Sequence, residues 1–206
     1  MPLFLRPGVL APGALGSLRI IDPGLFKPVP LAPGKPSTDA TLNPDALARL
    51  VRSTALALSD LPEDAPGAAG SFLLWREGES DLLLRPDDMQ TRLADGIVAF
   101  SLPVGCDQTG VTQVHMSYFV GAPERPAGMV VATEERPRGP AAIVDVWGER
   151  LIAFGWRVLL EIAVRLAADS GRDEDGVPLL PAAMLATANG FTVTPMARHA
   201  MDRGAA

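Results

Sequence analysis

The stretch GIVAFSLPVGCDQTGVTQVHMSYFVG, residues 96–121, contains two apolar runs on either side of a turn sequence. The runs GIVAFSLP and VTQVHMSYFVG are rich in the β-branched and aromatic residues that strands favour. The connection between them, VGCDQTG, is short and carries turn-forming residues. Short connections join antiparallel strands, because parallel strands need a long crossover. This stretch therefore predicts an antiparallel β-hairpin.

Further strand-like runs flank this hairpin on both sides. The runs SFLLWRE (71–77) and DLLLR (81–85), separated by a turn at Gly78 and Glu79, predict a second hairpin. The run AGMVVATEE (127–135) predicts one more strand. Between the two hairpins, RPDDMQTRLADG has Pro86 in its first turn, acidic residues after it and Gly96 beyond its end. That pattern indicates a short helix.

Two longer helices are expected outside these strands. NPDALARLVRSTALAL (43–58) begins with Asn43 as a cap, Pro44 at the first helical position and Asp45 near the positive helix end. From Ala141 to Asp169, charged residues recur every four residues and leave the rest of the surface apolar. We therefore expect charge on the outside at Glu149, Arg157 and Glu161, and buried side chains at Ile152, Leu159, Ile162 and Leu166.

The predicted element order is helix, two strands, short helix, three strands, long helix. It indicates an α+β fold, in which a mainly antiparallel sheet of about five strands is covered by the N-terminal helix and the long C-terminal helix. This element order resembles roadblock-type and GAF-type domains, which would imply an assembly or sensing module. We expect a core domain over 43–170 and a C-terminal tail over 171–206, with a short helix in PAAMLATANG (181–190).

Residues 1–42 form a separate region, rich in proline and glycine, with the pattern RPGVLAPGALG followed by DPGLFKPVPLAPGKP. Proline and glycine exclude long regular elements, so we expect an extended N-terminal arm. The arm also carries large apolar side chains, which need burial against the core or a second subunit. The residues expected to be buried are Leu3, Phe4, Leu5, Ile20, Ile21, Leu25 and Phe26.

The composition limits the possible partners. Charged residues make up 20 % of the chain, below the share of about 25 % usual in soluble domains, which favours self-association or a protein partner. A net charge of −6 and only two lysines argue against nucleic acid. Charged residues interrupt the long apolar helix, which excludes a membrane-spanning helix. A single cysteine cannot form an internal disulfide or a thiolate zinc site. We expect a cytoplasmic protein without a membrane span, metal or cofactor.

Cys106 and His115 are the scarce chemical groups of the central hairpin, and they raise the question of a nucleophile and its base. On a hairpin they would lie about 15 Å apart at ~3.3 Å per residue, too far to share a proton. Strand alternation also places His115 on the polar face. An inert turn thiol and a solvated or interface histidine are therefore favoured over a catalytic pair.

Arg136 and Arg138 precede the long helix, where two guanidiniums and the helix N-terminus could hold an anion. Glu134 and Glu135 could pair with these arginines instead, and no phosphate-loop motif accompanies them. SGRDEDG (170–176) lacks the ligand spacing of a calcium loop and is interpreted as a polar turn.

Two functional hypotheses remain from the sequence. The first is a non-catalytic assembly or interaction protein that self-associates or docks on partners through its arm and tail. The second is a small-molecule-binding or hydrolytic domain with a pocket between the sheet and the long helix, using Arg136, Arg138, His115 or Cys106. We predict no catalytic residue with a named role.

Overall fold

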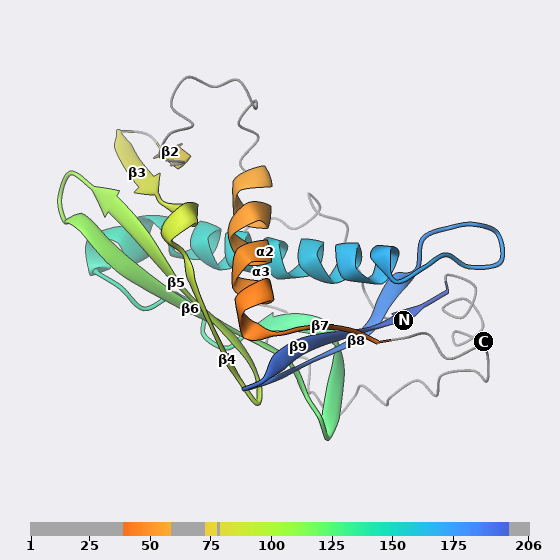
Figure 1. Ribbon diagram of the computed structural model, residues 1–206. Coiled ribbons are helices and arrows are strands. Elements are labelled where there is room, and N and C mark those ends of the chain that lie inside the picture. Colours follow the sequence, from red (N-terminus) through yellow and green to blue (C-terminus); the bar gives the residue numbers. More distant parts are fainter. Residues whose placement is uncertain (1–38, 59–72, 78, 198–206) are drawn as a thin grey trace.

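A computed structural model describes residues 39–58, 73–77 and 79–197 of the protein (Figure 1). The seven apolar arm residues predicted to be buried lie outside these described residues. In chain order the described elements are β1 (Ala40–Leu42), α2 (Pro44–Ala57), β2 (Leu73–Glu77), β3 (Ser80–Leu84), the 3-10 turn η3 (Pro86–Asp88), β4 (Gln90–Ala94), β5 (Gly96–Cys106), β6 (Gly110–Ala122), β7 (Arg125–Ala132), α3 (Ala141–Asp169), β8 (Leu180–Thr187) and β9 (Gly190–Met196).

The strands form one sheet with the order β1-β9-β8-β7-β6-β5-β3-β2, and β4 also pairs with β5. Every pair of neighbouring strands is antiparallel, and the described residues combine this sheet with two α-helices, which confirms the predicted α+β class. The long strands β5 and β6 form the predicted hairpin, in register from Ser101 opposite His115 to Cys106 opposite Gly110. The described residues contain nine strands rather than about five.

One extra strand replaces the short helix expected over residues 85–96. Only Pro86–Asp88 turn as a helix, and Gln90–Ala94 then pair with Ile97–Ser101 of β5. The turn between β4 and β5 is Asp95–Gly96, and Gly96 has a φ of 77°. Asp-Gly is a strong hairpin signal, because both turn positions accept positive φ. The sequence interpretation was wrong here because it assigned Gly96 to a helix end.

The helix expected in PAAMLATANG is also absent. Leu180–Thr187 form β8, which lies between β7 and β9 in the sheet. Ala188 and Asn189 connect Thr187 to its partner Gly190 at the start of β9. Alanine, leucine and methionine favour helices, but a central position between two strands overrides that weak preference. The region expected as a tail thus supplies two strands of the sheet, and β1 pairs with β9 at its edge.

The two predicted long helices are present with the expected ends. Asn43 caps α2, because its side-chain oxygen accepts a hydrogen bond from the Ala46 N–H at 2.8 Å. Helix α3 spans Ala141–Asp169, packs against β6 to β9, and crosses α2 (Figure 1). Its predicted orientation is confirmed, since Ile152, Leu159 and Ile162 are buried, Leu166 is half-buried, and the three charged positions are exposed.

The layer between the sheet and α3 is closely packed. Tyr118 of β6 is fully buried there and packs against Phe100, with ring centroids 5.7 Å apart and ring planes tilted by 53°. Its hydroxyl donates a hydrogen bond of 2.8 Å to the carbonyl of Ile152 in α3. Gly155 permits this approach, because a Cβ at that position would lie 2.2 Å from the Tyr118 oxygen. Burial raises the pKa of Tyr118 far above its usual value.

Candidate functional site

The outer face of β5 and β6, opposite the packed layer, carries the polar side chains of the central hairpin. Ser101 pairs with His115 across the two strands, and its hydroxyl donates a 2.9 Å hydrogen bond to the Gln113 side chain. The next residue on the same face of β6 is Ser117, whose hydroxyl lies 2.5 Å from that of Thr133. His115 is exposed, as strand alternation predicted.

His115 and Arg138 are brought together by the main chain. The His115 N–H donates to the Arg138 carbonyl and the Arg138 N–H donates to the His115 carbonyl, both at 2.8 Å. Two residues that exchange both hydrogen bonds face each other at a Cα separation of about 5.5 Å, with their side chains on the same face. The segment after β7 therefore continues along β6 and places two of the four predicted ligand residues beside each other.

The two arginines of this segment already have carboxylate partners. Arg138 donates from Nε to both oxygens of Glu134, at 2.9 and 3.0 Å, and a further bond joins its Nη2 to Oε1. This forked hydrogen bond raises the pKa of Arg138. Arg136 pairs instead with Asp145 in the first turns of α3, with 2.9 Å between Nη1 and Oδ1. An anion at this place would have to compete with these carboxylates.

Cys106 lies apart from this group. The register places it five residues along β5 from Ser101, the partner of His115. At ~3.3 Å per residue this is about 16 Å, in agreement with the sequence estimate. Its sulfur lies 3.3 Å from the Thr109 hydroxyl in the turn between β5 and β6. That hydrogen bond lowers the pKa of Cys106, against the opposing effects of desolvation and the Asp107 charge.

An aromatic cluster lies where β2 meets α3; the sequence suggested Trp75 and Trp147 as pocket-lining or core residues but not their contact with each other. The Trp75 ring contacts the Trp147 and Phe154 rings, with centroids 6.2 and 5.6 Å away. The Arg150 guanidinium lies over both indoles, 4.9 Å from the Trp75 centroid and 5.3 Å from that of Trp147, and also pairs with Glu77 at 3.5 Å. Their three-residue spacing on a helix could have indicated contact between Arg150 and Trp147. It could not have indicated that β2 places Trp75 beside them.

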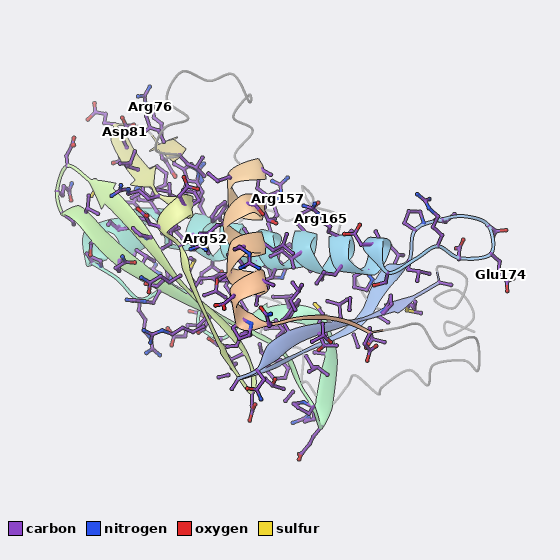
Figure 2. All side chains as sticks on the ribbon, viewed as in Figure 1. Arg52, Arg76, Asp81, Arg157, Arg165 and Glu174 are labelled. Atoms are coloured by element: carbon purple, nitrogen blue, oxygen red, sulfur yellow. The ribbon has the colours of Figure 1, made fainter. Side chains whose placement is uncertain are left out.

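Exposed charged groups lie elsewhere on the described surface. At the far end of the β2–β3 hairpin, Arg76 and Asp81 lie side by side and form a 2.9 Å ion pair (Figure 2). Arg157 and Arg165 extend from the exposed side of α3 (Figure 2). Within residues 39–58, 73–77 and 79–197, no group of three or more His, Cys, Asp or Glu side chains could hold a metal ion. No helix in that part of the chain is both long and apolar enough to cross a membrane.

Comparisons of the chain with protein-family models, with curated proteins and with solved structures found no match.

Proposed function

We propose that this chain is a non-catalytic assembly protein, which self-associates or docks on protein partners through its N-terminal arm and C-terminal region. The observation that carries the proposal is the place where the arm joins the fold. The last residues of the arm predicted over 1–42 form β1 (Ala40–Leu42), which is the edge strand at one end of the sheet, so residues 1–38 precede this edge strand in the chain. An apolar segment attached to a sheet edge can reach a neighbouring molecule without disturbing the core.

The attachment of β1 to the sheet is well defined. Ala40–Leu42 pair with Phe191–Val193, and the Thr41 and Thr192 hydroxyls lie 3.0 Å apart. A Cβ at Gly190 would lie 2.8 Å from the Leu42 carbonyl oxygen, so a glycine at this position permits the close approach of β1. The arm therefore starts from a fixed point on the fold.

Four large apolar side chains are exposed on the described surface, and they would contribute to an interaction only where they lie together. Leu74, Val111, Val146 and Val164 have between 39 % and 64 % of their surface exposed, in a chain with few charged residues. Large exposed apolar groups are typical of interaction surfaces when they gather together.

A second candidate function, the binding of a small anion, is favoured by the pairing of His115 with Arg138. The buried layer between sheet and α3 is filled by apolar side chains together with Tyr118, and His115 and Arg138 lie outside it. An anion would therefore bind on the outer face. Titration with inorganic phosphate should then shift the His115 ring signals in an NMR spectrum, and an Arg138→Gln variant should lose the shift. Unchanged signals would contradict this candidate.

Deletion of residues 1–38 tests the main proposal, because it leaves β1 in place. We expect the full chain to exceed monomer mass in light scattering and the shortened chain to lose mass while its circular dichroism spectrum keeps the core signal. A matched deletion of residues 198–206 measures the contribution of the C-terminal end separately. If neither deletion changes the mass, assembly through the arm and tail is refuted.

A further inference from the structure

The aromatic cluster between β2 and α3 has the chemistry of a site for a cation. The Trp75 and Trp147 rings are tilted by 41° with their centroids 6.2 Å apart. Phe154 stands perpendicular to Trp75, at an angle of 84° and 5.6 Å between centroids, and so supports the orientation of that ring. The faces of aromatic rings are negative, and the indole face attracts cations most strongly. The tilt brings two such faces together at one place.

The cation that occupies this place is the guanidinium of Arg150. Its central carbon lies 4.9 Å from the Trp75 centroid and 5.3 Å from the Trp147 centroid, inside the range of about 6 Å for a cation–π contact. Glu77 follows Trp75 by two residues on the same side of β2, and its Oε2 lies 3.5 Å from Nη1 of Arg150. Two indoles and one carboxylate therefore surround one guanidinium. We call Trp75, Glu77 and Trp147 the cation site.

The contacts that hold Arg150 in the cation site are open to water. Its side chain is 47 % exposed, and that of Glu77 is 55 % exposed. Cation–π contacts and ion pairs at exposed positions are weak, because water competes for the charged groups. Trp147, by contrast, is only 2 % exposed and lies beneath the guanidinium. Departure of Arg150 would therefore uncover an indole face without breaking a buried ion pair.

The position of the site leaves room for an incoming group. β2 is the last strand at its end of the sheet, so no further strand of the described chain lies beyond Trp75. Trp75 itself is half-buried. A segment of another molecule can thus approach the site from the side of the sheet end.

We propose that the cation site binds the guanidinium group of an arginine in a partner protein, and that Arg150 is an internal occupant which this arginine displaces. The present occupant indicates the ligand class. A guanidinium is flat, stacks on aromatic faces and can donate from its edge to a carboxylate such as Glu77, whereas an ammonium has no flat face and is more strongly hydrated. The site should therefore prefer arginine to lysine. This inference goes beyond assembly through the arm and does not depend on it.

The internal occupant sets the affinity that an external arginine shows. A group that is held on the same chain competes at an effective concentration on the order of millimolar. If Arg150 fills the site for about nine-tenths of the time, only about a tenth of the molecules can bind a ligand, and the apparent affinity is about tenfold lower than the intrinsic one. Arg150→Ala should therefore bind external arginine about tenfold more tightly than the unchanged protein.

Titration of the full chain with N-acetyl-arginine amide, followed by the indole N–H signals in an NMR spectrum, tests this proposal. The Trp75 and Trp147 signals should shift and saturate, with the tighter binding in Arg150→Ala. The Trp156 signal is an internal control and should stay in place, because that indole donates to the Val130 carbonyl outside the site. N-acetyl-lysine amide is the matched ligand and should bind more weakly.

Two variants check that the shifts come from the cation site. Trp75→Leu in the Arg150→Ala background should abolish saturation, and Glu77→Gln, at an exposed position, should weaken binding several-fold while circular dichroism shows an unchanged fold. If Arg150→Ala fails to fold, Arg150→Gln keeps more of the side-chain stem and takes its place. Free arginine distinguishes a small molecule from a protein partner, because only the free amino acid carries a charged amine and carboxylate.

Four results would overturn the inference. They are no saturable shift in Arg150→Ala, the same shift after Trp75→Leu, equal affinity for the arginine and lysine amides, and equal affinity of the unchanged protein and Arg150→Ala. Tighter binding of free arginine than of its blocked amide would refute a protein partner. These titrations are independent of the mass lost or kept on deletion of residues 1–38, so failure of this inference is distinguishable from failure of assembly through the arm.

Discussion

Replacement of Gly155 by alanine should destabilise the protein through a clash with Tyr118. A Cβ at position 155 would lie 2.2 Å from the Tyr118 oxygen, 2.9 Å from its Cζ and 3.1 Å from its Cε2. Ordinary contact distances are about 3.5–4.0 Å, so the ring or the helix has to move by about an ångström. The ring cannot move freely, because it is fully buried and its hydroxyl is bonded to Ile152.

The size of the effect follows from three contributions. Overpacking of this kind costs about 1–3 kcal/mol, and loss of the buried hydrogen bond costs about 1 kcal/mol more. Alanine in a helix interior is about 1 kcal/mol better than glycine, which offsets part of the loss. We therefore expect Gly155→Ala to lower the free energy of unfolding by about 1–3 kcal/mol. This corresponds to a fall in Tm of about 2–12 °C for a chain of this size.

Urea denaturation followed by circular dichroism provides the measurement, and Gly148→Ala is the matched control in the same helix. A Cβ at Gly148 would come no closer than 3.3 Å, to Pro137 Cδ, so this change should alter stability by less than about 1 kcal/mol. Tyr118→Phe removes the clashing oxygen, and in that background Gly155→Ala should cost about 1 kcal/mol less. Equal effects of the two glycine substitutions, or strict additivity with Tyr118→Phe, would refute the reasoning.

Three further changes test other contacts. Asn43→Ala removes the side-chain oxygen that accepts a hydrogen bond from the first turn of α2 at 2.8 Å. It should lower the free energy of unfolding measured in urea by about 1 kcal/mol, whereas Asn43→Asp, which keeps an acceptor, should lower it much less. Thr109→Val removes the hydrogen bond that lowers the pKa of Cys106, so the pH midpoint of Cys106 alkylation should rise. An unchanged midpoint would contradict the role of Thr109. Arg150→Ala removes the guanidinium that lies over two indole rings. It should lower the free energy of unfolding by about 0.5–1 kcal/mol and alter tryptophan fluorescence. Unchanged stability and emission would exclude a cation–π contribution.

The candidate site was only partly predictable. Strand alternation placed His115 on the polar face, and distance along the hairpin separated it from Cys106, because both depend on geometry within one hairpin. The neighbour of His115 could not be found in this way. Arg138 reaches it because the segment after β7 pairs with β6, and its guanidinium then binds Glu134. The role of these residues in ligand binding stays a prediction.

The sequence by itself determined the elements whose signals are local. Asn43 and Pro44 set the start of α2, the four-residue charge spacing set the orientation of α3, and the turn sequence within residues 96–121 set the central hairpin. Only the tertiary structure decided β8, whose residues are compatible with helix until partner strands supply hydrogen bonds. The strand β4 had a local signal in Asp95–Gly96, which the sequence interpretation assigned to a helix end. The pairing of β1 with β9 has the same origin as β8, because it joins segments far apart in the chain. Local preference carries no information about which distant strands will meet.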